Sequence, residues 1–158
     1  MFGGLVPKRL DNDYRGHKLA LWLLGVVVAL KGTQSLAIIF SGYATAKGAD
    51  GVPLDSFSPE AAQTVVAVFT QGSLWRLTFC VLCAILLVRY RSAAPMMLAL
   101  FALNHLAAQV LFQFAPLPRV GAPVGPLVNL LLFVVTCVGL ALSLWRRGDS
   151  LATGSHAA

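Results

Sequence analysis

Charged side chains are scarce in this sequence. They make up 11% of the 158 residues, and the apolar fraction reaches 58%, whereas soluble domains have roughly 25% and about 45–50%. This composition excludes an ordinary soluble domain. Acidic residues are rarer still, with six against twelve basic ones, and none lies deep inside a hydrophobic segment. A carboxylate relay that moves protons across a membrane is therefore not expected.

Cysteine and histidine are also few, which limits the chemistry of the chain. Cys80 and Cys83 form a C-x-x-C pair similar to that of quinone-linked disulfide-generating membrane oxidoreductases, but the predicted external loops contain no cysteine. We therefore interpret both residues, together with Cys137, as small buried apolar side chains. His105 is the one histidine in a hydrophobic segment, so a haem held by two histidines is not expected. Zinc, phosphate-loop and Ser/His/Asp motifs are absent, and we predict no catalytic residue, no metal site and no cofactor.

Four long hydrophobic segments occupy most of the chain. They cover about residues 19–43, 60–88, 94–115 and 127–145, and each is near the ~20 residues that a helix needs to cross a bilayer. The first is too long for the roughly 7–15-residue core of a signal peptide, so we expect it to remain in the protein. The sequence predicts an all-α polytopic membrane protein whose residues 1–158 form a single domain, an antiparallel four-helix transmembrane bundle. A cytoplasmic arm (1–18), an external loop (44–59) and a cytoplasmic tail (146–158) complete it.

The basic residues are divided unequally between the two sides of this bundle. Eight lie on the side of the termini and two lie on the opposite side. Because cytoplasmic loops of membrane proteins carry an excess of lysine and arginine, both termini are predicted to be cytoplasmic. The net charge of +6 is then explained by its role in setting the orientation and by contact with anionic lipid headgroups. No nucleic-acid partner is predicted. The eight are Lys8, Arg9, Arg15, Lys18, Arg89, Arg91, Arg146 and Arg147, and the two are Lys47 and Arg119.

Local signals mark helix ends and one packing seam. Residues 58–60 (Ser-Pro-Glu) predict a helix start, with a serine N-cap, proline at the first position and an acid in the first turn. Gly139 and Ser143 predict a close helix contact, either within one chain or between two copies. A stiff external hairpin before the fourth helix is predicted from four prolines: Pro116, Pro118, Pro123 and Pro126.

Polar side chains inside the apolar segments form one layer. Counted at 1.5 Å per residue from the nearest cytoplasmic charge, Lys31, Arg76 and His105 lie about 20 Å deep, beyond the bilayer midplane. Charged groups at such a depth cost roughly 2.5–3.5 kcal/mol each and normally face a bundle interior. We therefore predict a ligand-binding pocket between the helices, open to the outer side. Its candidate residues are Lys31, Gln34, Gln71, Arg76, Asn104, His105, Gln109 and Asn129.

The polar layer has a second interpretation. The same side chains could hold the helices together through interhelical hydrogen bonds without binding anything. If the layer binds a ligand, two cations favour a small anionic or carbonyl-bearing amphiphile, such as a lipid, fatty acid or quinone. The protein is then a non-enzymatic binder or an accessory subunit. An oligomeric anion-selective transporter or channel using Lys31 and Arg76 is the alternative, and an enzyme that acts on lipid through His105 is a third. The expected partners are membrane lipids and either further copies of the chain, as a homo-oligomer, or a larger membrane complex.

Two stretches resemble a known group of proteins. Residues 11–18 (Asp-Asn-Asp-Tyr-Arg-Gly-His-Lys) lead into the first segment, and residues 49–57 (Ala-Asp-Gly-Val-Pro-Leu-Asp-Ser-Phe) precede the second. Both resemble the corresponding parts of small uncharacterised four-span inner-membrane proteins of proteobacteria, and the resemblance covers most of the chain. It implies a bacterial inner membrane and no particular activity.

Overall fold

The computed structural model describes residues 5, 7, 9–14 and 16–145. Within these residues the protein is all-helical, as the sequence predicted. Its long helices are α1 (Lys18–Gly48), α2 (Pro59–Arg89), α3 (Ala94–Phe114) and α4 (Val124–Leu144), and the short 3₁₀ helices η2 (Leu54–Ser56) and η3 (Arg91–Ala93) lie in the connections. All four long helices have the length and hydropathy needed to cross a membrane. The predicted tail (146–158) and part of the predicted arm (1–4, 6, 8 and 15) lie outside the described residues.

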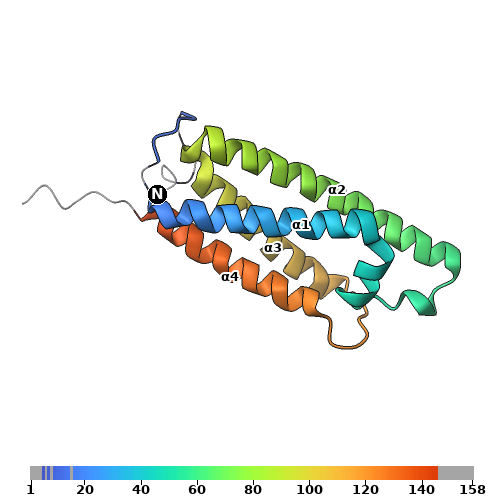
Figure 1. The fold of residues 1–158 in the computed structure, drawn as a ribbon. Helices are drawn as coiled ribbons and strands as arrows, with labels where there is room; N and C mark the ends of the chain where they lie inside the picture. The colour runs from blue at the N-terminus through green and yellow to red at the C-terminus, as the bar shows by residue number, and fades with distance from the viewer. Residues whose placement is uncertain (1–4, 6, 8, 15, 146–158) are drawn as a thin grey trace, which may run out of the picture.

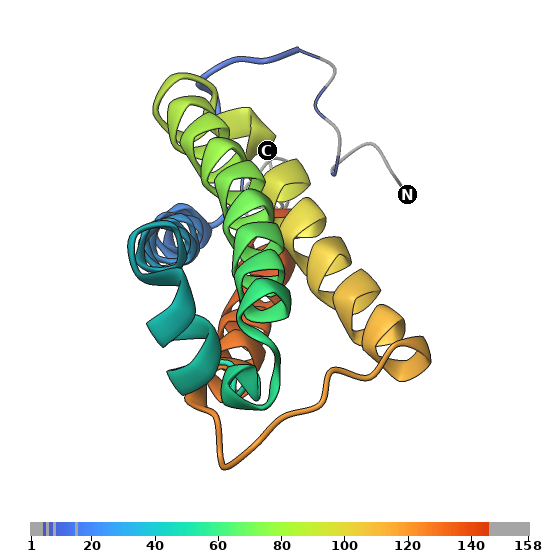
Figure 2. The same ribbon diagram turned by 90° about the vertical axis from the view of Figure 1, so that its right-hand side faces the viewer.

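The four long helices pack side by side in one bundle (Figure 1). α1 packs mainly against α2 and α4, and α3 packs mainly against α4. The α1–α2 and α3–α4 connections meet at one end, here called the loop end (residues 44–58 and 115–123) (Figures 1 and 2). The start of α1, the α2–α3 turn and the end of α4 meet at the other, here called the terminal end (residues 9–17, 90–93 and 145) (Figure 1).

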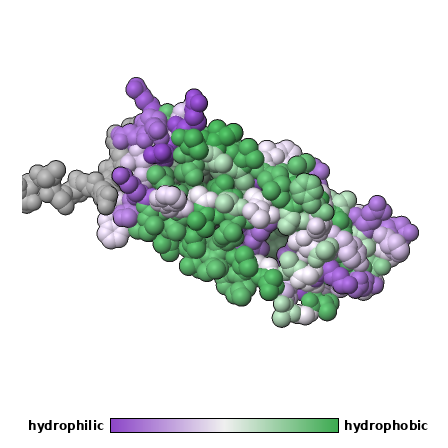
Figure 3. All heavy atoms as spheres, in the orientation of Figure 1, coloured by the Kyte–Doolittle hydropathy of each residue, from purple (hydrophilic) through white to green (hydrophobic). Residues whose placement is uncertain are grey.

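The surface of the bundle is apolar along its middle. Hydrophilic side chains gather at the two ends, and hydrophobic ones cover most of the region between them, where a few hydrophilic atoms show at a hollow (Figure 3). Large apolar side chains point outward, with exposed fractions of 82% for Phe40, 76% for Trp22 and 69% for Leu127. A continuous apolar surface of this kind marks contact with a membrane or a partner. Together with the four helices of spanning length, it fits a multi-pass membrane protein.

The tightly packed core lies in the half of the bundle near the terminal end. Leu24, Met97 and Leu98 are at most 1% exposed and belong to this cluster. The thiols of Cys80 and Cys83 are free and buried among them, as predicted. These small side chains let α2 approach α1, since apolar thiols pack as hydrophobes.

The predicted seam on α4 joins helices within one chain. A Cβ placed on Gly139 would lie 3.2 Å from Leu98 Cδ2 and 3.5 Å from Leu23 Cβ, so α4 lies close to both α3 and α1. Ser143, one turn later, is 6% exposed. The prediction that Cys137 is buried was wrong, because Cys137 is exposed on the outward face of α4. A thiol there can face lipid as an apolar group.

The sequence located one helix start correctly and misplaced another. Ser58 Oγ accepts a hydrogen bond from Ala61 N–H at 3.3 Å and caps α2, with Pro59 as the first residue. α4, however, begins at Val124, so Pro126 lies in its first turn rather than in the hairpin. The first N–H groups of a helix have no intrahelical acceptor, and a proline there removes no helical hydrogen bond.

α1 extends five residues beyond the predicted end at Tyr43 and bends at Ser41. Ser41 has non-helical angles (φ −137°, ψ 43°), and the helix then continues to Gly48. Its last turns, residues 42–48, point toward the α3–α4 connection (Figures 1 and 2). Gly42 permits close packing at the bend, because a Cβ there would lie 2.9 Å from Val66 Cγ1 on α2. The residues after Tyr43 are small or polar, so hydropathy gave no sign that the helix continues.

Backbone hydrogen bonds fasten the two connections together at the loop end. Val120 N–H donates to Gly51 O at 2.8 Å, and Gly125 N–H donates to Ala49 O at 2.8 Å. We call this pair of bonds the loop latch. Gly51 has a positive φ of 71°, a conformation that costs other residues energy. A Cβ on Gly51 would also lie 3.0 Å from Val120 O, so the latch depends on glycine at this position.

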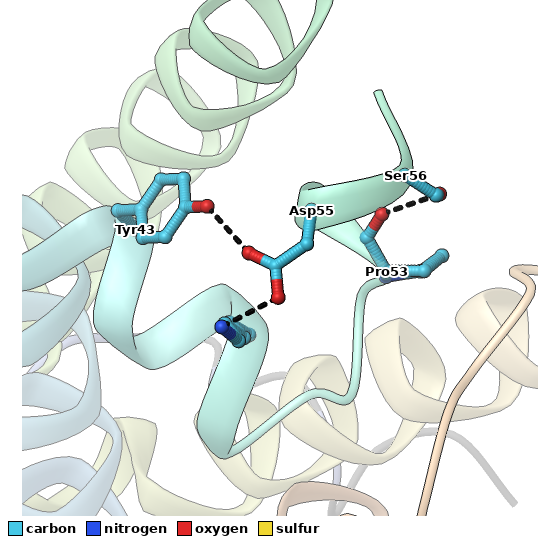
Figure 4. A network of polar contacts seen from close by, with 5 residues as sticks. Tyr43, Pro53, Asp55 and Ser56 are labelled. Atoms are coloured by element: carbon cyan, nitrogen blue, oxygen red, sulfur yellow. Dashed lines mark hydrogen bonds and ion pairs between the residues drawn. The ribbon is translucent and has the colours of Figure 1, made fainter. Parts of the chain in front are cut away.

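Asp55 ties the α1–α2 connection to the bent end of α1 (Figure 4). It accepts a hydrogen bond from Tyr43 Oη at 2.9 Å and pairs with Lys47 Nζ at 2.6 Å. These two partners, Lys47 first, lower the pKa of Asp55. Nearby, Ser56 Oγ donates to Pro53 O at 2.7 Å within the 3₁₀ turn. The carboxylate is exposed, so solvent screening limits its effect on stability, and its main role is to orient the connection.

At the terminal end, the chain before α1 is held against the bundle. Asp11 N–H donates to Ser92 Oγ at 3.0 Å, and Ser92 Oγ donates to Asp11 O at 2.9 Å. His17 N–H donates to Leu142 O at 3.1 Å. Tyr14 packs against the core, and this burial raises the pKa of Tyr14 to about 12. The arm is therefore attached to both the α2–α3 turn and α4.

The loop latch predicts a difference between two glycines of positive φ. Gly121 has a φ of 79°, but a Cβ there meets nothing within 4 Å. Gly121→Ala should therefore lose only the conformational preference, about 1–2 kcal/mol. Gly51→Ala should lose more, because its methyl group also crowds Val120 O. Denaturant unfolding in detergent, followed by circular dichroism, measures both losses, and equal values would contradict the close approach of Val120 O to Gly51.

Candidate functional site

A cavity lies inside the bundle on the loop-end side of the packed core. Its volume is about 680 Å³, within the ~300–1,000 Å³ typical of small-molecule sites. All four long helices contribute to its wall. The lining residues are Val27, Lys31, Gly72, Trp75, Arg76, Phe79, Leu100, Phe101, Leu103, Asn104, His105, Ala107, Asn129, Leu132, Phe133 and Thr136.

Lys31 brings a cation into the cavity from α1. Its Nζ donates a hydrogen bond to Asn129 Oδ1 on α4 at 2.6 Å, so the ammonium has a neutral partner. Ser35, one turn later on α1, is fully buried, and its Oγ donates to the Lys31 carbonyl at 2.9 Å. Lysine has three N–H donors, and Asn129 accepts from one of them. The others can meet a ligand.

Arg76 brings a second cation from α2. Its Nη2 donates to Ser73 Oγ at 3.2 Å, and Ser73 is fully buried. Within the part of the chain that the structure describes, Ser73 is the hydrogen-bond partner of this guanidinium. Arginine carries five N–H donors in a planar fork that matches a carboxylate or phosphate. Most of the fork therefore stays available on the cavity side.

α3 and α4 add an aromatic and amide surface opposite the cations. The His105 ring stacks on the Phe133 ring, with centroids 4.4 Å apart and planes at 13°. Gln109 Nε2 lies 3.3 Å from His105 Nε2, so an amide N–H can donate to the unprotonated ring nitrogen. Asn104 lines the cavity one residue before His105.

The rest of the cavity wall is apolar. The rings of Phe79 and Phe101 meet edge to face, with centroids 5.1 Å apart. Trp75, Leu103 and Leu132 complete this part of the wall. The cavity therefore joins a cationic and amide-bearing surface to a hydrophobic and aromatic one, which is the pattern that an amphiphilic ligand requires.

The structure brings together five of the eight candidate residues named from the sequence: Lys31, Arg76, Asn104, His105 and Asn129. Gln34, Gln71 and Gln109 do not line the cavity. Gln71 and Gln109 are exposed, and Gln34 is half-buried. Gln71 precedes Arg76 by five residues, about 140° around the helix, so it points away. Gln34 and Gln109 share helix faces with Lys31 and His105, but they lie nearer the loop end than these residues and outside the cavity wall.

Sequence reasoning missed two polar residues that belong to the site. Ser73 precedes Arg76 by three residues, a helical spacing at which side chains meet. This spacing was the available signal for Ser73. Thr136 also lines the cavity, but its Oγ1 donates to the Leu132 carbonyl at 2.7 Å within α4.

Asp50 approaches the cations from the loop end. Asp55, also at the loop end, pairs with Lys47 instead. Burial raises the pKa of Asp50, while the positive charges of Arg76, Arg119 and, less strongly, Lys31 oppose this rise. A Cβ on Gly125 would lie 2.7 Å from Asp50 Oδ1, which places the carboxylate at the positive N-terminus of α4.

Comparison with known proteins gives no further information about this site. No protein-family model, curated protein or solved structure matches the chain significantly. Among the described residues, no group of three histidine, cysteine or acidic side chains could hold a metal ion. The chemistry of the site therefore has to be read from the cavity itself.

The Lys31–Asn129 hydrogen bond can be tested by a double-mutant cycle. Asn129→Leu leaves the Lys31 ammonium without its acceptor and should destabilise the protein by about 1–3 kcal/mol. Lys31→Met combined with Asn129→Leu should recover part of this loss, because no donor is then left unpaired. Val128→Leu, at a partly exposed neighbouring position, serves as the control. Unfolding free energies in detergent that simply add for the two single variants would contradict the interaction.

Proposed function

We propose that this protein is a non-enzymatic membrane protein that binds a small anionic or carbonyl-bearing amphiphile in the cavity. Lipids, fatty acids and quinones belong to this class. The observation that carries the proposal is the position of Lys31 and Arg76, which line one cavity together with apolar and aromatic side chains. A role as an accessory subunit in a larger membrane complex is compatible with such binding.

The energetic cost of the two cations supports a ligand of opposite charge. Each costs roughly 2.5–3.5 kcal/mol in the middle of a membrane helix. Their hydrogen-bond partners, Asn129 and Ser73, are neutral. Asp50 interacts with both cations through charge, but one carboxylate offsets at most one of the two positive charges. An anionic headgroup would neutralise the cavity and accept the remaining N–H donors.

We further propose that the helices form an antiparallel bundle in a bacterial inner membrane with both termini in the cytoplasm. The helix ends support this arrangement, since the start of α1 and the end of α4 lie at the terminal end (Figure 1). The basic residues at that end are Arg9, Lys18, Arg89 and Arg91, and those near the loop end are Lys47 and Arg119. Lys8, Arg15, Arg146 and Arg147, outside the described residues, add to the bias in the sequence. Lysine and arginine favour the cytoplasmic side.

Reporter fusions test the orientation. Green fluorescent protein fused after Ala158 should fluoresce, because it folds in the cytoplasm. Alkaline phosphatase fused after Ser56 should be active, because it requires the periplasm, and the same enzyme fused after Tyr90 should be inactive. The reverse pattern of activities would overturn the orientation.

A fluorescent fatty acid tests the binding function. Arg76→Ala and Lys31→Ala should each raise the Kd for dansyl-undecanoate by about tenfold or more, because a charge-assisted hydrogen bond contributes roughly 1.5–3 kcal/mol. Arg119→Ala is the matched control, since Arg119 is an exposed loop cation that lies 5.7 Å from the Phe112 ring centroid and does not line the cavity. The same Kd in all three variants and the unmodified protein would contradict the proposal.

A further inference from the structure

The cavity is closed on most of its sides. The core around Leu24, Met97 and Leu98 fills the bundle between the cavity and the terminal end. α1 packs on α2 and α4, and α3 packs on α4, so these three seams between neighbouring helices are better packed than the fourth. At the loop end, the bent end of α1 and the loop latch join the two connections. A ligand that enters along the bundle axis would have to break this latch.

The fourth seam, between α2 and α3, is different. These two helices make few direct contacts, and their axes diverge toward the loop end (Figure 2). The cavity-lining residues that are also exposed gather along this seam. Trp75 is 70% exposed, Leu103 is 61% exposed and Leu100 is 42% exposed. The cavity therefore opens sideways, where the bundle surface is apolar.

We call this opening the α2–α3 portal and define it by the lining residues that are also exposed, in which Asn104 is the polar member and the others are apolar or glycine: Gly72, Trp75, Leu100, Leu103, Asn104 and Ala107. In a membrane its rim would face hydrocarbon, not water. A water-soluble anion would meet an apolar barrier at this rim. A membrane-resident amphiphile would instead reach the cations by sliding its headgroup between α2 and α3 while its chain stays in lipid.

We propose that the α2–α3 portal admits a single-chain carboxylate, such as a long-chain fatty acid, from the outer half of the bilayer. The carboxylate then lies at Arg76 and Lys31, and the hydrocarbon chain leaves the cavity past Trp75 and Leu103. This inference rests on the proposed binding function and specifies its ligand class and its route. It also specifies the expectation that the pocket opens to the outer side, by placing the opening within the bilayer.

Two observations favour one carboxylate with one chain. Lys31 and Arg76 each keep N–H donors beyond those given to Asn129 and Ser73, and the planar fork of Arg76 matches a single carboxylate. The cavity of about 680 Å³ has the size of a site for a drug-sized molecule. It is therefore large enough for a carboxylate headgroup and the first part of one chain.

Tryptophan fluorescence tests the portal directly. The chain has three tryptophans, Trp22, Trp75 and Trp145, so replacing two of them with phenylalanine leaves a single reporter. In nanodiscs, a nitroxide-labelled stearate should quench the Trp75-only protein in a saturable way, and Arg76→Ala should abolish the saturable part. The matched Trp22-only protein, whose indole is 76% exposed on α1, should show only quenching proportional to the stearate in the bilayer. Saturable quenching of Trp22 equal to that of Trp75 would overturn the portal.

Two further measurements separate the portal from the binding function. Unlabelled stearate should relieve the saturable quenching of Trp75, whereas butyrate at the same concentration should not. Equal displacement by butyrate would overturn the need for a chain in the portal. Binding of stearate that depends on Arg76 without quenching of Trp75 would overturn the portal and leave the proposed function standing. Binding that does not depend on Arg76 would overturn both.

A variant with a bulky side chain in the portal tests whether the ligand passes through it. A Cβ on Gly72 meets nothing within 4 Å, so Gly72→Phe can fold while its ring obstructs the portal. It should slow the exchange of bound stearate at least tenfold. Val68→Phe is the control, because Val68 lies one turn earlier on α2, is 66% exposed and does not line the cavity. Unchanged exchange in a folded Gly72→Phe protein would contradict the portal.

Discussion

The structure depends on how an apolar bundle accommodates two cations in its interior. Lys31 and Arg76 cannot be covered by close-packed aliphatic side chains, because a buried charge without polar partners is too costly. The bundle places them beside Asn129 and a buried Ser73, at hydrogen-bond distances of 2.6 and 3.2 Å. The space around the cations stays open as a cavity of about 680 Å³. The same requirement thus sets both the polar contacts and the open space.

The two halves of the bundle, on either side of this cavity, are stabilised in different ways. Near the terminal end, small and aliphatic side chains such as Ala20, Leu24 and Ala94 are fully buried, and the helices pack closely. Toward the loop end α2 and α3 separate, and the bundle is held instead by hydrogen bonds between the two connections. The bend at Ser41 brings the connection after α1 over that end. The bundle is thus closely packed on the terminal-end side of the cavity and held by backbone hydrogen bonds at the loop end. The α2–α3 seam is its least packed boundary.

Much of this could be predicted from the sequence, because helix length, hydropathy and depth are properties of one segment at a time. Those properties gave four spans and the depth of Lys31, Arg76 and His105. The direction in which a side chain points and the contacts between segments could not be predicted from the sequence. The glutamines at 34, 71 and 109 belong to the same polar layer but do not line the cavity. Ser73 could be assigned to the site only through its helical spacing to Arg76. Asp50 lies near the cations because of the bend at Ser41 and the loop latch. No local sequence pattern predicts either of these features.

The central claim is that the cationic cavity holds an anionic amphiphile taken from the membrane. Native mass spectrometry of the detergent-purified protein tests it most directly, because it weighs the chain together with whatever it retains. The account predicts one bound single-chain acidic lipid per chain, which dissociates as an anion. Protein that carries no adduct, or that carries phospholipids only in the proportions of the surrounding membrane, would contradict it.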